Sequence, residues 1–431
     1  MKKGAFISYQ MVEAIKMIQQ YDLSNKDDRL FAEQQLNVLK ERWYNDVIPG
    51  YNVRIEDKIA GMQELTIDGV LEFIEKIKNV DILSTECCGN MQYCMVRDSE
   101  GNINFDFKYL EEIASFARDN EKKIVIDSAI VFGDHFPENM SNMNLNEIVE
   151  AISKYTQVLT SRFGDCIERI DVLNSIFQRK DVLNNSKAIT VEQFWINYFG
   201  KNYPEKVSQI VKSNMQDQKI KLGWNEFYIT NQNIPQKRKD FIKKIKETPS
   251  IDVIGLQDNF RTDSDVNYII KSLNEVLQNC SNNGKELSIT ELSCKLSRKD
   301  IDVLFEAKNN GTYNEKVVDL NKRISCIIEG VTEFAQKRGI LSLEARVSDE
   351  YDPNHEEAKK YGFDINTSIS RDEKVDKLLD SRSGLKDEFK ASLREYVNSD
   401  DVYEFSSDLE NDKDICEIEQ DKNSSEHKEF R

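Results

Sequence analysis

Histidine is scarce in this chain of 431 residues, which contains only His135, His355 and His427. The three lie far apart in the sequence, so chemistry that depends on paired histidines has little material, and no zinc site is expected. The eight cysteines include the adjacent Cys87 and Cys88 but form no C-x-x-C pair. This cysteine usage fits a reducing compartment, and we expect neither a bound metal nor another cofactor.

Long apolar runs and an excess of positive charge are also missing. No stretch of about 18 apolar residues occurs, so no membrane-spanning helix is predicted. The formal net charge is -18. This charge argues against nucleic acid or an anionic membrane as a partner, because binding to phosphate groups needs a basic surface. No particular oligomeric state is predicted.

An export signal is not apparent at the start of the chain. A signal peptide needs an unbroken apolar stretch, and Ser8, Gln10, Glu13 and Lys16 interrupt it here. The sequence as it stands is therefore expected to be cytoplasmic. A secreted protein from which the signal had been removed would look the same, so secretion stays open as the alternative.

The chain divides into three parts by composition and pattern. Residues 1–60 are charged and show helical spacing of apolar residues, which predicts a helical N-terminal extension. Residues 61–380 alternate between helix-like and strand-like segments. Residues 381–431 are acidic and poor in core residues, which predicts a flexible tail. Hydrophobic residues make up 39% of the chain, enough to fill a core, while 32% are charged and indicate a well-solvated exterior.

Seven short β-rich runs lie in the middle part and alternate with longer segments of helical pattern. The β-rich runs are Asp81–Ser84, Lys123–Phe132, Ile167–Leu173, Ile220–Tyr228, Ile251–Leu256, Glu286–Leu292 and Gly339–Ala345. The helical segments are Lys108–Asn120, Leu145–Phe163, Lys206–Gln216, Arg238–Glu247, Ser264–Cys280 and Glu315–Lys337. Strand followed by helix, repeated in this way, is typical of an α/β fold, the (β/α)8 TIM barrel.

Active sites of this fold lie at the C-terminal ends of the strands. The polar residues that close the β-rich runs are therefore the candidates: Asn174, Ser175, Asn225, Glu226, Gln257, Asp258, Asn259, Glu291 and Glu344. Glu291 is the strongest of them. It follows a strand whose alternate residues Leu287 and Ile289 are apolar, so its carboxylate is expected at the rim of a packed barrel. A charge in that position needs partners or a function.

Aromatic residues at or near the predicted strand ends offer flat faces on which sugars can stack. They are Tyr93, Phe132, Trp224, Phe227 and Tyr228. The alternative is that about half of them face the core, and for Trp224, in the middle of a run, the two possibilities are equally open.

Five short motifs, in this order and spacing, resemble those of one enzyme family. Glu100–Phe105 is similar to Q-G-x-F-N-F, Asp171–Ser175 to W-D-V-V-N-E, Lys221–Phe227 to a strand ending in N-D-Y, Ile251–Gln257 to P-I-D-G-I-G-F-Q, and Ile289–Leu292 to I-T-E-L. The chain thus resembles the family 10 glycoside hydrolases, which are retaining endo-β-1,4-xylanases with a (β/α)8 barrel. The resemblance extends from about Ser84 to Asn366.

The resemblance implies that Glu291 is the catalytic nucleophile and that a saccharide is the substrate or ligand. The residues expected to bind it are Asn174, Asn225, Gln257, Tyr93 and Phe132.

Several positions depart from the family pattern. The acid/base glutamate of the family falls on Ser175, and further positions around the scissile sugar differ. Counted one by one, these further positions are five: Gln92 replaces a lysine, Ser128, Gly133 and Asn259 replace histidines, and Leu343 replaces a tryptophan. Strand-building residues persist while the groups around the scissile sugar have changed.

The serine at position 175 has a mechanistic consequence. A retaining glycosidase uses two carboxyl groups about 5 Å apart, one as nucleophile and one as proton donor. Serine has no proton of suitable acidity. Glu226 or Glu344 is a possible substitute acid. The sequence therefore predicts a glycoside hydrolase-like protein of carbohydrate metabolism whose activity is weak, altered or absent.

Two other functions stay open at this point. One is a non-catalytic barrel, a pseudoenzyme, that binds a saccharide or a protein. The other is a scaffold whose helical N-terminal segment and acidic tail mediate assembly.

Overall fold

The computed structural model describes residues 1–45, 66–133, 137–176, 188–231, 235–295, 300, 303, 310 and 312–345. All of them belong to one compact unit, which comprises residues 1–178 and 187–370. The second unit consists of residues 179–186 and 371–431 and lies outside the described residues, as does the predicted acidic tail.

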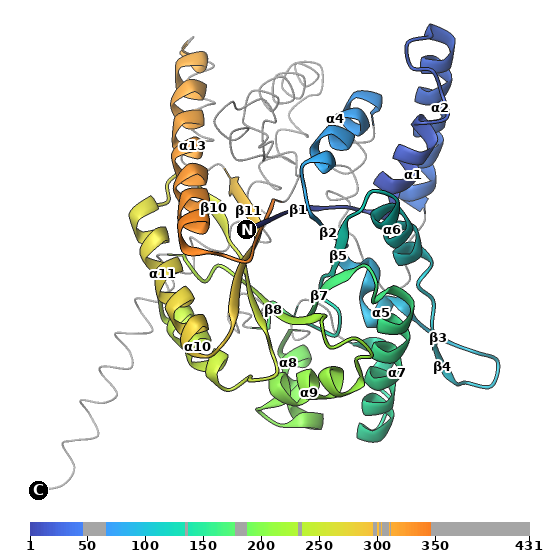
Figure 1. Ribbon diagram of the computed structural model, residues 1–431, viewed down its shortest axis with the longest axis vertical. Coiled ribbons are helices and arrows are strands. Elements are labelled where there is room, and N and C mark those ends of the chain that lie inside the picture. The colour runs from blue at the N-terminus through green and yellow to red at the C-terminus, as the bar shows by residue number, and fades with distance from the viewer. Residues whose placement is uncertain are drawn as a thin grey trace, which may run out of the picture. The chain divides into compact units, whose positions relative to one another are not determined.

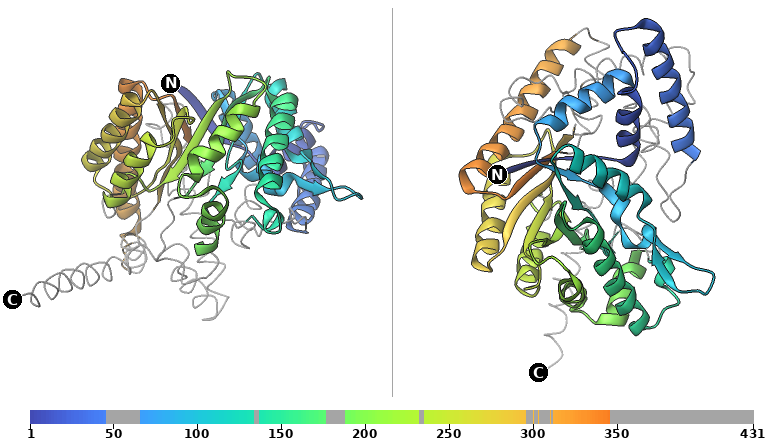
Figure 2. Two further views of the ribbon diagram at one scale, coloured as in Figure 1. Left: turned by 90° about the horizontal axis from the view of Figure 1, so that it is seen from below. Right: turned by 45° about the vertical axis from the view of Figure 1, so that its right-hand side comes forward.

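Eight parallel strands form a closed barrel. They are β1 (Lys2–Phe6), β2 (Ile82–Ser84), β5 (Lys123–Ile126), β7 (Ile167–Asn174), β8 (Lys221–Phe227), β9 (Val253–Gln257), β11 (Glu286–Lys295) and β12 (Ser342–Ala345). The first and last strands pair, with Lys2 opposite Ser342, and β9 pairs with β11 to complete the ring. Figures 1 and 2 show these strands at the centre with helices outside them. The predicted (β/α)8 barrel is confirmed.

The helices surround the sheet and bury their apolar faces against it. The longer ones are α1 (Tyr9–Ile18), α2 (Lys26–Asn45), α4 (Ile67–Lys78), α6 (Lys108–Asp119), α7 (Leu145–Phe163), α8 (Ala188–Phe199), α9 (Tyr203–Asn214), α10 (Pro235–Lys246), α11 (Val266–Asn282) and α13 (Tyr313–Arg338). Local sequence sets their ends. Ser8, for example, accepts a hydrogen bond from the Met11 amide at 3.2 Å and so begins α1.

Shorter elements lie in the segments that follow the C-terminal ends of the strands. They include η1 (Glu86–Gly89), α5 (Met91–Cys94), the hairpin of β3 (Met95–Arg97) and β4 (Ile103–Phe105), η2 (Glu138–Met140), and two short strands, β6 (Val131–Phe132) and β10 (Asn259–Arg261). β6 pairs with the end of β7, and β10 pairs with the end of β11. β6 and β10 thus lie beside the ends of β7 and β11, beyond the ring.

The prediction that residues 1–60 form an extension outside the barrel is wrong for the start of this segment, while residues 46–60 lie outside the described residues. Residues 2–6 are β1, which lies between β12 and β2 in the ring. The helical pattern that follows is real, since α1 buries Met11, Ala14 and Ile15. It belongs, however, to the first strand-and-helix unit of the barrel, so the barrel begins at β1 and not at residue 61.

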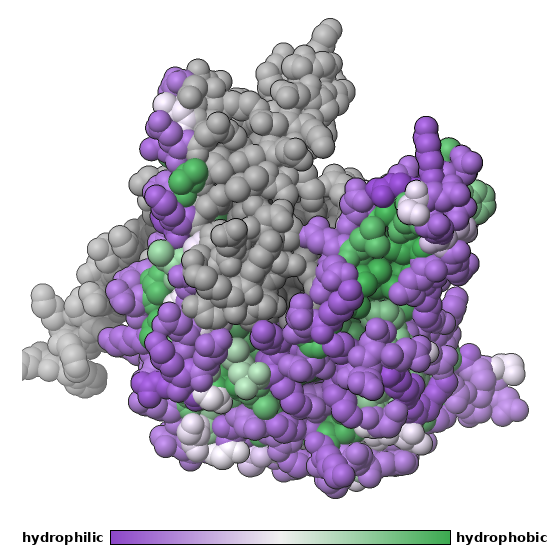
Figure 3. All heavy atoms as spheres, turned by 45° about the horizontal axis from the view of Figure 1, so that its top comes forward, coloured by the Kyte–Doolittle hydropathy of each residue, from purple (hydrophilic) through white to green (hydrophobic). Residues whose placement is uncertain are grey.

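The face drawn in Figure 3 is largely hydrophilic where residues are described, and its largest apolar stretch lies on the side of α1, α2 and α4. Large apolar side chains exposed on α2 and α4 are Leu30, Phe31, Val38 and Leu71.

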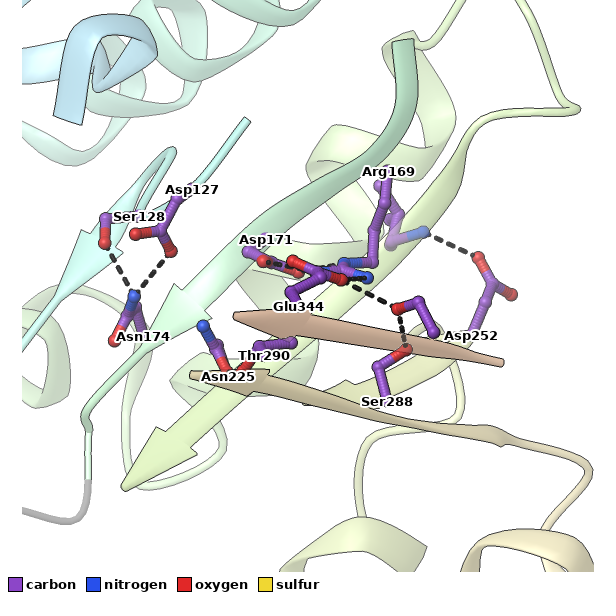
Figure 4. Close-up of polar contacts among 12 residues, drawn as sticks. Asp127, Ser128, Arg169, Asp171, Asn174, Asn225, Asp252, Ser288, Thr290 and Glu344 are labelled. Carbon is purple, nitrogen blue, oxygen red and sulfur yellow. Dashed lines mark hydrogen bonds and ion pairs between the residues drawn. The ribbon is translucent and has the colours of Figure 1, made fainter. Parts of the chain in front are cut away.

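The interior of the barrel contains a buried ion cluster. Arg169 reaches from β7 across the ring to β12, where its guanidinium lies 2.9 Å from Glu344, and it also bonds Asp171 at 2.8 Å. Figure 4 shows the three side chains together, surrounded by strands. Ser342 adds a hydrogen bond to Glu344 at 2.7 Å. One cation between two carboxylates satisfies most of the buried charge.

Glycines make room for this cluster. A Cβ added at Gly223 would overlap the Asp171 carboxylate, and one added at Gly4 would lie 2.6 Å from Glu344 Cγ. We expect Gly223→Ala to lower the free energy of unfolding by about 1–3 kcal/mol, the usual range for overpacking. Urea unfolding followed by circular dichroism measures the change.

Gly330→Ala, in the middle of α13, is the matched control. There the added Cβ meets only a terminal methyl group of Val266, and alanine favours the helix by about 1 kcal/mol. A larger loss for the α13 variant than for Gly223→Ala contradicts this account of the interior.

Candidate active site

A β-bulge turns the last residue of β7 toward the interior. Asp171 pairs with Gly223 of β8 and Leu173 pairs with Trp224, so Val172 is an extra residue on β7. The bulge moves the inward-facing positions by one residue, from Asp171 to Asn174. The Asn174 side chain thereby enters the mouth of the barrel, at the end where the strands finish.

A second bulge acts on β11 in the same way. Ile289 and Leu292 pair with two residues of β12 that are only two positions apart, so β11 carries one extra residue between them. Thr290 faces inward, since its hydroxyl bonds Asn225 across the barrel. Strict alternation would turn Glu291 outward. The bulge instead leaves Glu291 facing the mouth, where its Oε1 accepts a hydrogen bond from Gln257 at 2.8 Å.

Backbone strain concentrates at the same end of the barrel. Ser128, Ser175 and Tyr228 follow β5, β7 and β8 and have φ values of 52°, 53° and 56°. Left-handed backbone at a residue other than glycine costs roughly 1–3 kcal/mol and occurs preferentially at functional sites. Three such residues at neighbouring strand ends indicate that this end carries a function.

A continuous chain of hydrogen bonds crosses the mouth from β5 to β11. The Asn174 amide donates to Asp127 Oδ1 at 2.8 Å and to the Ser128 hydroxyl at 2.6 Å, as Figure 4 shows. Ser175 Oγ lies 2.7 Å from Asn174 Oδ1 and 3.0 Å from Gln257 Oε1. Gln257 in turn donates to Glu291. The sequence-predicted residues Asn174, Gln257 and Glu291 thus share one network.

Ser175 occupies a restricted place in this network. Its hydroxyl has one proton but faces two amide oxygens, those of Asn174 and Gln257. The amide nitrogens of both neighbours already donate to carboxyl groups, those of Asp127 and Glu291, which fixes their orientation. Ser175 therefore links the two amides and has no further proton for a ligand.

Asn225 forms a second branch at the mouth. Its side-chain oxygen accepts a hydrogen bond from Thr290 of β11, and its side chain also bonds Asp127 of the segment after β5. Gly255 leaves room for this contact, since an added Cβ would lie 2.6 Å from Asn225 Oδ1. The predicted ligand-binding residue Asn225 therefore faces the interior and joins the same network.

Asp127 is the residue of this network that the sequence did not single out. It follows β5 directly and is 7% exposed. Burial raises the pKa of its carboxyl to about 8, and the negative charges of Asp171 and Glu291 add to the rise, while hydrogen bonds from Asn174 and Asn225 oppose it. Asp127 is consequently protonated at neutral pH and lies within electrostatic reach of Glu291.

The two predicted aromatic residues lie on the same rim but outside the hydrogen-bond chain. Phe132 of β6 stands opposite Asn174 in the register of the short strand pair and is half-buried. Tyr93 lies on α5, whose first residue bonds the Ala129 carbonyl just beyond Asp127. Trp224, by contrast, is fully buried and packs edge-on against Phe241 of α10, with ring centroids 5.0 Å apart.

The prediction that Glu226 or Glu344 could serve as a substitute acid is wrong. Glu226 follows the inward-facing Asn225 and therefore faces the helix layer, where it is fully buried and pairs with Lys237 of α10 at 3.1 Å. Glu344 faces inward but is fully buried in the ion pair with Arg169. Neither carboxyl group reaches the mouth.

The model of glycosyl hydrolase family 10 matches residues 73–335, more than half of the chain. The chain belongs to this family. No curated protein matches it.

Several solved structures are similar to this family 10 member. Native CbXyn10B is 15% identical, with 85% of this chain and 90% of that one covered and a TM-score of 0.50. An endo-1,4-beta-xylanase from Caldicellulosiruptor owensensis is 15% identical, with 85% and 89% covered and a TM-score of 0.48. A mutant in complex with xylotriose is 15% identical, with 85% and 89% covered and a TM-score of 0.49. At such identities the likeness to the first of these shows the fold.

Within the described part of this family 10 member, two kinds of feature are absent. None of the described helices is long and apolar enough to cross a bilayer. The described cysteine and carboxylate side chains form no group of three or more that could hold a metal ion.

The signal that could have found Asp127 is present in the sequence. Polar residues that close a β-rich run are the candidates in this fold, and Asp127 closes the run that begins at Lys123. The apolar residues Ala129–Phe132 extend the predicted run past Asp127, so the sequence places the end of the run too late. In the structure β5 ends at Ile126, a turn with Ser128 at a φ of 52° follows, and Val131 and Phe132 form the separate strand β6.

Proposed function

We propose that this family 10 member is a retaining glycoside hydrolase for β-linked xylo-saccharides, with Glu291 as the nucleophile. The observation that supports the proposal best is the bulge in β11, which brings Glu291 into the barrel mouth. A carboxylate that Gln257 orients toward the open end of a barrel can attack an anomeric carbon. Ile289–Leu292 resembles the nucleophile strand of the family.

The neighbouring amides support the same function. Asn174, Asn225 and Gln257 converge on the mouth from three adjacent strands. Amide groups donate and accept hydrogen bonds, as sugar hydroxyls require. Phe132 and Tyr93 stand on the rim and offer aromatic faces for stacking.

The experiment that tests this function is covalent trapping. Dinitrophenyl β-xylobioside, fluorinated next to the anomeric carbon, gives a long-lived ester with a retaining nucleophile. Its activated leaving group departs without help from an acid. We expect one fluoroxylobiosyl group per chain in the intact mass, located on the peptide that contains Glu291. No adduct, or an adduct on another carboxylate, contradicts the proposal.

A second candidate is a non-catalytic barrel that binds saccharides. It is favoured by Ser175, which replaces the family's proton donor and is occupied with two amide oxygens. For this function, xylo-oligosaccharides bind in titration calorimetry and the trapping reagent leaves no adduct.

Restoring the family's acid is expected to fail. Ser175→Glu would place a carboxylate against the side-chain oxygens of Asn174 and Gln257. These two amides cannot turn to donate to it, because their nitrogens already donate to the carboxyl groups of Asp127 and Glu291. We expect no measurable release of reducing sugar from xylan by this variant, and a lower unfolding temperature, since an unpaired buried charge is costly.

Ser175→Ala is the control for this variant. It removes the hydroxyl without adding a charge, and turnover of dinitrophenyl β-xylobioside is expected to stay nearly unchanged. Robust xylan cleavage by Ser175→Glu contradicts the prediction.

A further inference from the structure

The proposed function leaves one requirement unmet, a proton donor for the leaving oxygen. Such a donor must line the mouth, must hold a proton at neutral pH and must face Glu291. Most carboxyl groups near the mouth fail these conditions. Asp171 and Glu344 are held by Arg169 in the interior, and Glu226 faces α10.

Asp127 satisfies the condition of position. The ring runs β1, β2, β5, β7, β8, β9, β11, β12, so β5 and β11 are four strands apart in either direction. Asp127 after β5 and Glu291 on β11 therefore stand on opposite sides of the mouth. Asn174 and Asn225 come from β7 and β8, the next two strands after β5 in the ring, and both bond Asp127. A glycosidic bond lying across the mouth has one carboxyl group on each side.

Asp127 also satisfies the condition of protonation. The groups that bond it are amides, not cations, and it is almost completely buried. The charged groups that face it are the carboxylates of Asp171 on β7 and Glu291 on β11. Burial first, and these like charges second, raise its pKa to about 8. A carboxyl group that retains its proton beside an ionised carboxylate is the arrangement that divides acid from nucleophile in a glycosidase.

Because Ser175 stands where the family has its acid, the proton must come from another residue. Asn174, which bonds Asp127, directly precedes Ser175, the position that the family's acid occupies. The Asp127 carboxyl is therefore one amide side chain away from the place of the lost glutamate. We propose that Asp127 is the proton donor of this barrel and replaces the missing acid at position 175. This inference rests on the proposed function, in which Glu291 is the nucleophile.

The reaction then balances in two steps. In the first, a Glu291 oxygen forms a bond to the anomeric carbon, the glycosidic carbon–oxygen bond breaks, and the Asp127 proton passes to the leaving oxygen. In the second, the Asp127 carboxylate takes a proton from water, whose oxygen bonds the anomeric carbon and releases Glu291. Water is consumed, and both carboxyl groups return to their initial states.

The test compares leaving groups. Asp127→Asn keeps the shape of the side chain and cannot donate a carboxyl proton. With phenyl β-xylobioside, whose leaving group needs protonation, we expect kcat/KM to fall by about 10²–10⁴-fold. With dinitrophenyl β-xylobioside, whose leaving group does not, the first step is expected to change less than about tenfold. Equal losses on the two substrates, or no loss on either, overturn the inference.

Asp258→Asn is the matched control. Asp258 is also buried, and burial raises its pKa to about 6, but it lies next to Gln257 on the face toward α10 and bonds Thr230. This variant is expected to show no selective loss on the phenyl substrate. A selective loss equal to that of Asp127→Asn contradicts the special role of Asp127.

A chemical rescue and a pH profile complete the test. Asp127→Ala with sodium azide is expected to form β-xylobiosyl azide, because the small anion attacks the anomeric carbon in place of water, needs no base to remove a proton, and releases Glu291. In the parent chain, kcat/KM for the phenyl substrate is expected to fall as the pH rises past about 8, when Asp127 ionises. The profile also decides the matter if the variants do not fold, since a parent rate without that decline overturns the inference.

Failure of the proposed function gives a different result. If dinitrophenyl β-xylobioside is not turned over in a manner that depends on Glu291, both the function and this inference are wrong. If that turnover occurs but Asp127→Asn shows no selective loss, the function stands and only the donor is wrong.

Discussion

Glu291→Gln is expected to lower the turnover of dinitrophenyl β-xylobioside by at least about a thousandfold, the order of loss when one of a set of cooperating catalytic groups is removed. The amide retains the size of the side chain and can still contact Gln257. It cannot form the ester to the anomeric carbon, however, so even a leaving group that needs no acid stays attached. Stopped-flow release of dinitrophenolate measures the loss.

The control for this prediction lies in the same network. Ser175→Ala removes a neighbour of Gln257 that has no proton to give, and its rate on the same substrate is expected to be close to that of the parent. Equal losses in the two variants contradict the assignment of the nucleophile, because they would mean that disturbing the network anywhere stops turnover.

Arg169→Leu is expected to lower the free energy of unfolding by about 3–5 kcal/mol, the range measured when one partner of a buried ion pair is removed. The variant leaves the carboxyl groups of Asp171 and Glu344 facing each other in the barrel interior without their cation. Urea unfolding of the folded chain measures the change.

The loss is expected to depend on pH. Burial already raises the pKa of Glu344, and removal of the guanidinium raises it further. A carboxyl group whose pKa is raised by folding stabilises the protein at low pH, and that contribution is lost as the pH rises through the new pKa. The destabilisation by Arg169→Leu is therefore expected to be smaller near pH 5 than near neutral pH.

The same substitution at the surface provides the control. Arg118 bonds Asp165 at 2.7 Å, but both side chains are well exposed. Arg118→Leu is expected to cost about 1 kcal/mol or less, as exposed ion pairs do. Similar losses at the two positions contradict the structural role assigned to the buried cluster.

Most of the barrel could be predicted from the sequence because its strands are short apolar runs between long helical patterns. Seven of the eight strands overlap the predicted β-rich runs. The exception is β1, where only Gly4, Ala5 and Phe6 are buried and two lysines precede them. Five residues directly before a clear helical pattern are too few to predict a strand from sequence. They are recognised as a strand only by their pairing with β12 and β2.

Whether each site residue faces the barrel interior or the helices is harder to predict from the sequence than the strands themselves. Alternation assigns faces only where no bulge intervenes, and the bulges at Val172 and between Ile289 and Leu292 lie directly before a site residue. Val172 and Leu173 are both apolar, so the sequence gives no sign that one of them is extra. For the same reason Asn225 and Glu226, adjacent in the sequence, were equal candidates although they face opposite sides of the sheet.

Asp171 couples the stability of the buried ion cluster to the pKa of Asp127 at the barrel mouth. One of its neighbours, Arg169, anchors the interior, while its negative charge acts on Asp127 above it. A substitution that displaces Asp171 by destabilising the ion cluster is therefore expected to shift the pKa of Asp127 as well. Engineering this scaffold for heat resistance and tuning its acid–base chemistry are thus one problem, and candidate replacements at either level have to be assayed for both.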